Sequence, residues 1–244
     1  MMVSRTPKFS WREQGLVLLL LLIGAALRLW DAGQIPSGLY HDEAQNGLDA
    51  LRVLSEGDLP LYFAANNGRE PFYIYLITLS VGLLGRSPLA IRLPSFFVGT
   101  LTLAALYDLA RVLWGRRVGR WALAVLAVTF WHIHLSRVGF RAVMLPLFTA
   151  LFLAQCVRAI KSRRLGHWIA AGALYGAAWY TYMAVRFTPI VLAALIGYAL
   201  LCYKDRAKLH CKVALAFCAA ALAVLLPLGL STLRYPEIVM VRTG

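Results

Sequence analysis

The fold is decided by long apolar runs, of which the last, Val213–Leu230, reads VALAFCAAALAVLLPLGL and contains no charged residue. A run of this length is close to the roughly 20 residues that an α-helix needs to cross the hydrocarbon core of a bilayer. Six similar runs precede it, namely Leu16–Trp30, Leu93–Trp114, Trp121–Leu135, Ala142–Ile160, Trp168–Val185 and Phe187–Tyr203. The sequence therefore predicts an all-α polytopic membrane protein with about seven spans.

The amino-acid composition excludes an ordinary soluble protein. Of the 244 residues, 60% are hydrophobic and 15% are charged, and the mean hydropathy is +0.67. Soluble domains are nearer to half apolar and a quarter charged, because they need a polar surface. The same numbers exclude a disordered chain. The net charge of +14 would favour nucleic-acid binding in a soluble protein, so here it has to be compared with membrane topology first.

Many basic residues gather in four short segments outside the apolar runs. These segments hold Arg5, Lys8 and Arg12; Arg116, Arg117 and Arg120; Arg158, Lys161, Arg163 and Arg164; and Lys204, Arg206, Lys208 and Lys212. Cytoplasmic loops carry such an excess of Lys and Arg, and seven spans place all four segments in the cytoplasm. An eighth span at Phe72–Gly85 would place the last three outside, so we expect that segment to lie at the outer surface or to dip into the membrane. The charge thus reports topology, and we expect no nucleic-acid partner.

This topology predicts a single membrane domain, residues 1–244, in the plasma membrane with a cytoplasmic N-terminus. It leaves a large external loop over residues 31–91, on the face where we expect the active site. Seven of the eleven acidic residues lie between Asp31 and Glu70, within this loop. Such a concentration of carboxylates on an otherwise apolar protein makes the loop the best place to look for chemistry.

The first part of the external loop, residues 38–54, reads GLYHDEAQNGLDALRVL. Its apolar residues recur near helical spacing, which predicts an amphipathic helix on the outer membrane surface that ends before Gly57 and Pro60. Asp42 and Glu43 then lie in the first turn, where the positive end of the helix favours ionised carboxylates. Both are candidate catalytic residues at the level of the lipid headgroups. The alternative is a charged helix start without a chemical role.

Three arginines on the outer side are candidates to bind a phosphate group. Arg69 and Glu70 precede a proline-started helix rich in aromatic residues, and Arg137 and Arg141 lie in the next outer link. The guanidinium group suits phosphate because it offers paired donors. The alternatives are a surface pair between Arg69 and Glu70, and snorkelling of Arg137 and Arg141 at the membrane edge. Arg186 also faces outward in this topology, which leaves a place in the site open to it, but it is not among the site residues that we select.

A series of motifs runs along this part of the chain: His41-Asp-Glu-Ala, Gly68-Arg-Glu-Pro-Phe-Tyr-Ile-Tyr, Ile91-Arg-Leu-Pro-Ser and Gly115-Arg-Arg. Their order and spacing resemble those of the GT-C type integral-membrane glycosyltransferases, most closely family 39. That family includes protein O-mannosyltransferases and the aminoarabinose transferases that act on lipid A. The resemblance extends from about Leu27 to the end of the chain. It implies a module of one span, a large external loop with surface helices, and six further spans.

The resemblance also implies roles for residues of the first external loop. Asp42 matches an essential acid that activates the acceptor or organises the site, and Glu43 matches the acid that often follows it. Arg69 matches a basic residue that contacts the donor phosphate. Glu70 stands where the family commonly has the first residue of a Pro-Pro pair, so the local geometry of this loop departs from the family pattern.

The second external link matches the family less fully. Arg137 belongs to a Ser-Arg pair that relatives often have, and Arg141 matches a second basic residue. Many relatives then have a further carboxylate, but residues 142–144 are Ala, Val and Met here. The missing acid leaves Asp42 and Glu43 as the only candidate ligands for a divalent cation, and the metal requirement stays open.

The resemblance implies a membrane glycosyltransferase. It would move a sugar from a polyprenyl-phosphate carrier to a hydroxyl of a lipid, glycan or protein acceptor, with inversion at the anomeric carbon. A non-catalytic relative and a transporter for lipids or solutes are the alternatives. Relatives usually continue past the seventh span, which leaves open a fragment or a short form that works with a partner subunit.

Overall fold

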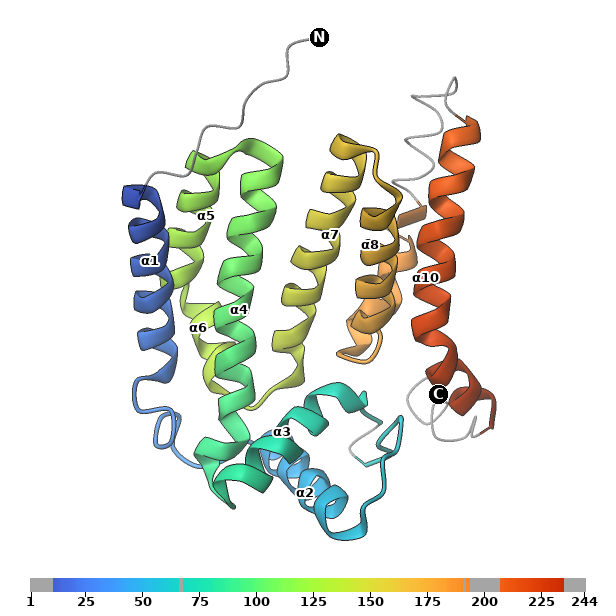
Figure 1. The fold of residues 1–244 in the computed structure, drawn as a ribbon. Helices are drawn as coiled ribbons and strands as arrows, with labels where there is room; N and C mark the ends of the chain where they lie inside the picture. Colours follow the sequence, from blue (N-terminus) through green and yellow to red (C-terminus); the bar gives the residue numbers. More distant parts are fainter. Residues whose placement is uncertain (1–10, 66–67, 191, 194–206, 235–244) are drawn as a thin grey trace.

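The protein is all-helical, as predicted, in a computed structural model that describes residues 11–65, 68–190, 192–193 and 207–234. Within these ranges the one β-type contact is an isolated antiparallel bridge between Phe63 and Arg69. The elements are α1 (Trp11–Leu29), α2 (His41–Glu56), α3 (Pro71–Leu84), α4 (Pro88–Trp114), α5 (Arg116–Val128), α6 (Phe130–Arg137), η1 (Arg141–Val143), α7 (Met144–Ser162), α8 (Leu165–Ala178), η2 (Met183–Phe187) and α10 (Ala207–Arg234). Figure 1 shows a bundle of upright helices with α2 and α3 lying across its lower end.

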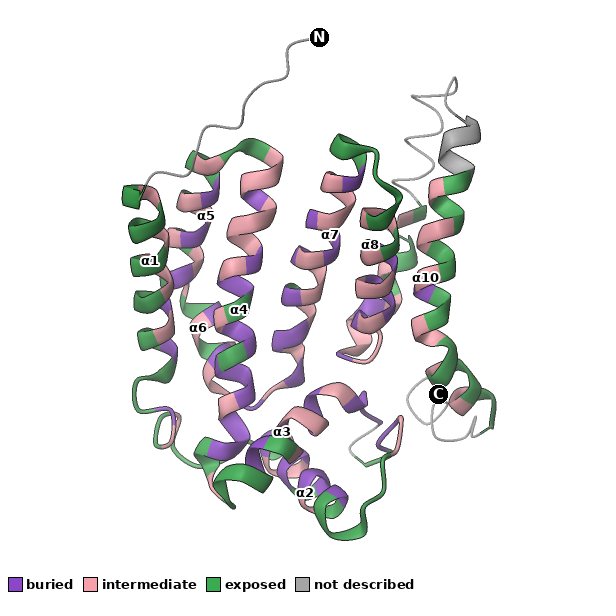
Figure 2. Cartoon of the chain, viewed as in Figure 1, coloured by how far each residue is buried: buried purple, intermediate pink, exposed green. Residues whose placement is uncertain are grey.

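Helices α4 and α7 stand in the middle of the bundle, with α1 and α5 on one side and α8 and α10 on the other (Figure 1). Buried residues line α4 and α7, whereas α1 and α10 are exposed over much of their length (Figure 2). Helices α8 and α10 approach closely because α8 has glycines at the contact. A Cβ atom added at Gly172 would lie 2.2 Å from the backbone oxygen of Phe217 in α10. Small residues allow this kind of close packing between membrane helices.

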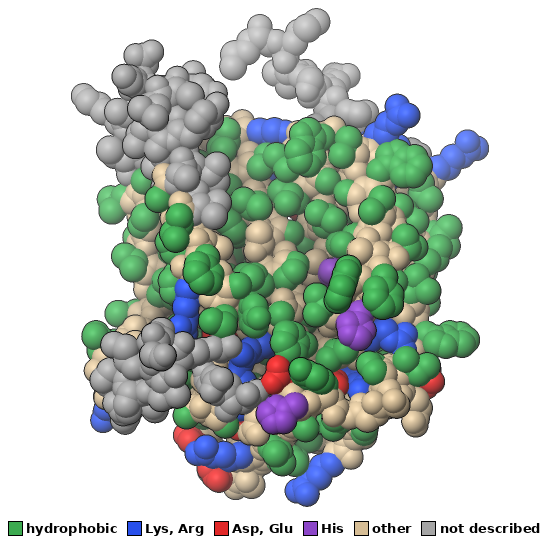
Figure 3. All heavy atoms as spheres, turned by 180° about the vertical axis from the view of Figure 1, so that it is seen from behind, with side chains coloured by type: hydrophobic (Ala, Val, Ile, Leu, Met, Phe, Trp, Pro, Cys, Tyr) green, Lys and Arg blue, Asp and Glu red, His purple; other side chains and the backbone are tan. Residues whose placement is uncertain are grey.

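The outer faces of the bundle are apolar, which suits a surface that faces lipid. Leu18, Leu22, Leu222 and Leu230 are among the exposed leucines. Figure 3 shows hydrophobic side chains over the middle of one face, Lys and Arg at its upper edge and again in its lower part, and acidic side chains in the lower part.

Three helical segments in the described residues are long and apolar enough to cross a membrane: Pro88–Trp114, Arg141–Ser162 and Lys212–Arg234. A fourth is added if the bent pair α5 and α6 counts as one span. The predicted run Phe187–Tyr203 lies mostly outside the described residues. Seven spans therefore remain a prediction.

The predicted run Trp121–Leu135 is two helices rather than one, bent by 60° at a break around Thr129. The physical reason is a buried arginine from α1. The guanidinium of Arg28 donates hydrogen bonds of 3.1 Å to the carbonyl oxygens of both Leu126 and Ala127, and lies 2.8 Å from Nδ1 of His132. The last carbonyls of a helix lack partners within the helix, so Arg28 supplies the donors that the break requires.

The described basic links lie at the end of the bundle opposite α2 and α3 (Figure 1). Here α5 begins at Arg116 and α7 ends at Ser162. Arg116 pairs with Glu13 of α1 at 3.2 Å, and Arg111 pairs with Asp108 at 2.7 Å. One end of the bundle is thus mainly basic, and the other carries the acid-rich loop.

Helices α2 and α3 form where the sequence predicted them, within residues 31–91. Helix α2 stops at Gly57, whose φ of 69° is the left-handed conformation that glycine adopts at helix ends. Helix α3 begins at Pro71 and is fixed to α4 by the Tyr73 hydroxyl, which lies 2.5 Å from Oγ of Ser95. Burial raises the pKa of Tyr73, so this hydroxyl stays protonated.

Candidate functional site

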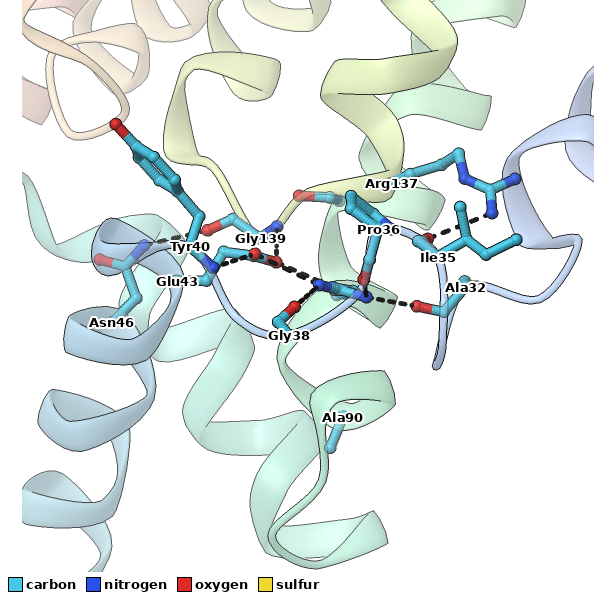
Figure 4. A network of polar contacts seen from close by, with 12 residues as sticks. Ala32, Ile35, Pro36, Gly38, Tyr40, Glu43, Asn46, Ala90, Arg137 and Gly139 are labelled. Atoms are coloured by element: carbon cyan, nitrogen blue, oxygen red, sulfur yellow. Dashed lines mark hydrogen bonds and ion pairs between the residues drawn. The ribbon is translucent and has the colours of Figure 1, made fainter.

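The first polar centre, at the end of the bundle that carries α2 and α3, is built around Glu43, whose side chain is only 1% exposed. One carboxylate oxygen, Oε1, accepts hydrogen bonds from Nε of Arg92 at 2.9 Å and from the backbone N–H of Gly139 at 2.7 Å. The other, Oε2, accepts from the backbone N–H of Tyr40 at 2.9 Å and from Arg92 at 3.4 Å. Figure 4 shows these contacts converging on Glu43. Four contacts fill the acceptor positions of a carboxylate.

Arg92, near the start of α4, is as buried as Glu43, and its guanidinium also makes several hydrogen bonds. Besides Glu43, it donates to the carbonyl oxygens of Ala32 at 3.1 Å, Pro36 at 2.9 Å and Gly38. The Glu43–Arg92 ion pair thereby joins the segment after α1, the start of α2 and the link after α6. Arg92 lies in the Ile91-Arg-Leu-Pro-Ser motif, but the sequence analysis gave it no role. The sequence did contain a signal for Arg92, because a charged residue among the apolar residues of a helix usually pairs with an opposite charge.

Asn46, one turn after Glu43, extends this centre to Arg69. Its side chain donates to the carbonyl oxygen of Gly139 at 3.0 Å and accepts from Arg69 at 2.8 Å. Arg69 also pairs with the buried Asp49 and donates from Nε to the carbonyl oxygen of Ala65 at 3.0 Å. The structure therefore places Arg69 in the interior, with donors of its guanidinium directed at groups of the protein.

Asp42 lies beside this centre, in the first turn of α2 as predicted. Its side chain is 31% exposed, and Oδ1 is 3.8 Å from Nδ1 of His41. Asp42 thus differs from Glu43 next to it, because its side chain remains partly accessible to solvent.

Arg137 lies at the end of α6. It donates to the carbonyl oxygens of Leu27 at 3.1 Å and Ile35 at 3.2 Å, on the side of α1. Figure 4 shows its side chain directed toward Ile35. The structure therefore does not gather the three predicted phosphate-binding arginines around one point.

The second polar centre is built around Glu70, which is also buried. Its Oε2 is 3.5 Å from Nε of Arg141, and its Oε1 is 3.9 Å from Nη2 of Arg186. The guanidinium of Arg141 also lies over the ring of Tyr182, 5.8 Å from the ring centre. Residues from the loop before α3, the link between α6 and α7 and the segment after α8 meet here.

A tight turn presents Glu70 to this centre. Phe63 and Arg69 exchange two backbone hydrogen bonds, 2.9 and 2.7 Å long, so Tyr62 lies opposite Glu70 in the antiparallel pair. Alternate residues of an extended chain point to opposite sides, which directs Tyr62 and Glu70 to the same face. Gly68 makes the turn with a φ of 78°, and a Cβ there would lie 2.3 Å from the Tyr62 hydroxyl.

A pocket of about 260 Å³ opens beside Glu70. It is lined by Tyr62, Glu70, Trp179, Arg186, Leu228 and Thr232. The loop supplies the first two residues, the segments after α8 supply the next two, and α10 supplies the last two. The pocket therefore lies between the loop before α3, the segments after α8 and the C-terminal part of α10.

One alternative that the sequence left open is wrong. Arg69 and Glu70 do not form a surface pair, because both are buried and each pairs with other residues. Arg186, which was not among the selected site residues, faces Glu70. No carboxylate follows Arg141 at residues 142–144, but the carboxylate of Glu70, from a different segment, lies 3.5 Å from it.

The described residues contain no group of three or more His, Cys, Asp or Glu side chains that could hold a metal ion. Asp42 and Glu43 do not fit a two-carboxylate cation site, because both oxygens of Glu43 already accept from Arg92 and backbone N–H groups.

Comparison with protein families identifies the chain. The family profile described as dolichyl-phosphate-mannose-protein mannosyltransferase matches residues 68–230. The chain belongs to this family. Membership confirms the GT-C type that the sequence motifs resembled. No curated protein matches the chain.

Solved GT-C structures share this family member's fold. ArnT from Cupriavidus metallidurans bound to undecaprenyl phosphate matches with a TM-score of 0.72 and 20% identity, over 92% of this chain and 43% of ArnT. The same enzyme in the apo state matches with a TM-score of 0.74 and 18% identity, over 95% and 44%. The Archaeoglobus fulgidus oligosaccharyltransferase matches with a TM-score of 0.71 and 18% identity, over 90% and 30%. The chain thus spans less than half the length of these proteins.

Proposed function

We propose that this protein is a membrane glycosyltransferase that moves a sugar from a polyprenyl-phosphate carrier to an acceptor hydroxyl. Membership of the mannosyltransferase family and the GT-C fold support this proposal. The ArnT structure in complex with undecaprenyl phosphate supports a polyprenyl phosphate as the carrier. The acceptor is a hydroxyl of a lipid, glycan or protein.

The observation that carries the proposal is that Arg141 and Arg186 meet Glu70 beside a pocket. Residues from the segments after α8 and from α10 help to line this pocket. A polyprenyl-phosphate sugar has an apolar tail, a charged phosphate and a polar sugar. Its parts need an apolar surface, positive charge and a polar pocket, close to one another at the membrane boundary. The lower end of this bundle offers all three together.

Asp42 is the proposed general base, because it is the accessible carboxylate at the start of α2. An ordinary aspartate is a weak base near neutral pH, so close orientation of the acceptor has to supply much of the rate. Attack by the acceptor oxygen on the face opposite the phosphate forms the new glycosidic bond as the bond to phosphate breaks. The anomeric carbon is thereby inverted, and the proton passes to Asp42.

Arg141 is the proposed contact to the leaving phosphate, where positive charge stabilises the transition state. Arg69 and Arg137, the other two predicted contacts, donate to protein groups. We therefore assign Arg69 to holding α2 and the loop together, and Arg137 to joining α6 to the chain after α1. Glu43 positions the helix start that carries Asp42.

The same proposal places the N-terminus in the cytoplasm of a plasma-membrane protein and the site on the external face. Its support is the separation of charge along the bundle, because the described basic links and the acid-rich loop lie at opposite ends (Figure 1). The excess of basic residues belongs on the cytoplasmic side.

The test is sugar transfer by the full chain, purified with labelled polyprenyl-phosphate sugars and a membrane extract as acceptor. We expect transfer by the wild type and at least a ~100-fold loss in Asp42→Asn, which removes the general base. Asp58→Asn is the matched control, because Asp58 lies exposed in the same loop and pairs only with surface Arg52 among the printed ion pairs of the structure. Full activity in Asp42→Asn contradicts the assignment of the base. Donor binding without turnover in the wild type favours a non-catalytic partner subunit.

A further inference from the structure

The pocket beside Glu70 contains an unusual group of unsatisfied polar atoms. The Tyr62 hydroxyl, both carboxylate oxygens of Glu70 and the indole nitrogen of Trp179 are buried without a hydrogen-bond partner in the part of the chain that the structure describes. Folded proteins leave few buried polar atoms in this condition. All four atoms belong to residues that line one pocket. Their concentration there indicates a ligand that supplies the missing hydrogen bonds.

The fold presents these groups together from separate elements. Tyr62 and Glu70 lie opposite each other in the turn closed by Phe63 and Arg69. Trp179 follows the last residue of α8, and the backbone N–H of Phe72 donates to the carbonyl oxygen of the next residue, Tyr180, at 3.1 Å. This bond holds the start of α3 against the end of α8. The positions of these polar groups are therefore fixed by packed backbone segments and do not depend on one flexible side chain.

The hydrogen-bonding character of the pocket is mixed. The carboxylate of Glu70 accepts, the indole N–H of Trp179 donates, and the Tyr62 hydroxyl does both. A hydroxyl group is also both donor and acceptor, so a ring bearing several hydroxyls matches this set. The two aromatic side chains add flat apolar surface for the C–H faces of such a ring. The volume of about 260 Å³ is below the roughly 300–1,000 Å³ of pockets for drug-sized ligands, which suits one monosaccharide.

The charges around Glu70 select against a charged ring. Arg141 and Arg186 lie 3.5 and 3.9 Å from its carboxylate, close enough to balance its charge but too far to fill its acceptor positions. An ammonium group bound to Glu70 would compete with its two arginines, and a carboxylate bound to the arginines would compete with Glu70, so either charge would leave a buried charged group of the protein without its partner. We infer that this pocket binds the uncharged, polyhydroxylated ring of the donor sugar, with Glu70 and Tyr62 as specificity-determining residues. The inference rests on the proposed function for the identity of the ligand as the donor.

Sugar binding can be measured without the lipid carrier, by saturation-transfer NMR of the full chain in detergent. The probes are methyl mannopyranoside as the neutral ring, and glucosamine and glucuronate as the charged rings. We expect the wild type to bind the neutral probe more tightly than either charged one. Loss of one neutral hydrogen bond in Tyr62→Phe weakens binding about fivefold, and loss of the charged acceptor in Glu70→Gln weakens it by about tenfold or more.

Tyr75→Phe is the matched control, because Tyr75 donates from the following helix to the carbonyl oxygen of Pro60 and does not line the pocket. It should bind like the wild type. Tyr62→Phe keeps the ring and every charge, so it remains informative if Glu70→Gln does not fold. Equal binding of all three probes, absence of binding by the wild type, or unchanged binding in Tyr62→Phe and Glu70→Gln overturns the inference. Failure of lipid-linked transfer alongside intact, Glu70-dependent sugar binding contradicts the proposed function and leaves the pocket assignment in place.

Discussion

Two buried glutamates near helices α2 and α3 differ in how their carboxylates are used. Glu43 accepts from Arg92 and from two backbone N–H groups, with four contacts between 2.7 and 3.4 Å. Glu70 is paired with two arginines at 3.5 and 3.9 Å, and neither of its oxygens has a hydrogen bond within the described residues. The first arrangement fixes one conformation. The second keeps acceptors ready for a ligand. Burial and charge alone therefore do not separate a structural carboxylate from a binding one, but hydrogen bonding does.

Breaking the Glu43–Arg92 pair should produce the largest effect on stability. Arg92→Met leaves Glu43 buried without its partner. It also removes the hydrogen bonds that Arg92 donates to the carbonyl oxygens of Ala32, Pro36 and Gly38. We expect a loss of about 3–5 kcal/mol in the free energy of unfolding, as for other broken buried pairs. Thermal unfolding in detergent, followed by tryptophan fluorescence, measures it. An unchanged melting temperature would show that the first centre is not structural.

The corresponding change in the second centre should cost much less stability. Glu70→Gln removes no hydrogen bond, and Arg186 is 30% exposed, so water can solvate its guanidinium. We expect a loss of about 1–2 kcal/mol, between the values for exposed and buried pairs. The same unfolding assay applies. A loss as large as that of Arg92→Met would remove the distinction between the two glutamates.

Gly68 tests whether the turn places Tyr62. Gly68→Ala should lower the free energy of unfolding by about 1–2 kcal/mol, because its φ is 78°. The new Cβ would also meet the Tyr62 hydroxyl at 2.3 Å, so the ring has to move and binding of methyl mannopyranoside should fall. Gly57→Ala is the matched control, with a φ of 69° and nothing within 4 Å of the new Cβ. If both variants bind the sugar normally, Tyr62 does not contact it.

The exposed pair of Arg52 and Glu56 should matter least. Arg52 Nε lies 2.8 Å from Glu56, and both side chains are more than half exposed. Neighbouring carboxylates raise the pKa of Arg52, which stays charged at any ordinary pH. Arg52→Ala should therefore change melting by the small amount expected of a surface pair, and leave transfer unchanged. A large loss of transfer would mean that the site extends to the end of α2.

Much of the fold could be predicted from the sequence, because apolar runs, prolines and glycines act locally. The last residue of α2 follows from Gly57, and the first residue of α3 follows from Pro71. The break at Thr129 could not be predicted, because its donors come from Arg28, about a hundred residues away in the chain. Periodicity does not report such a contact.

The candidate site was predictable in its residue types but not in its pairings. Asp42 and Arg141 were identified from position and motif. That Glu70 faces Arg141 and Arg186 depends on how the first loop packs against two later segments. Likewise, only the structure reveals that the Tyr62 hydroxyl and the Trp179 indole nitrogen are buried without a hydrogen-bond partner in the described residues.

The most direct test of the account compares two ligands on one protein. The quantity to measure is the ratio of the affinity for a polyprenyl-phosphate hexose to the affinity for the bare polyprenyl phosphate. We predict a ratio well above one in the wild type and in Tyr75→Phe, and a ratio near one in Glu70→Gln, with affinity for the bare phosphate retained. A ratio in Glu70→Gln equal to that of the wild type would contradict the claim that the unsatisfied carboxylate is the one that binds the sugar.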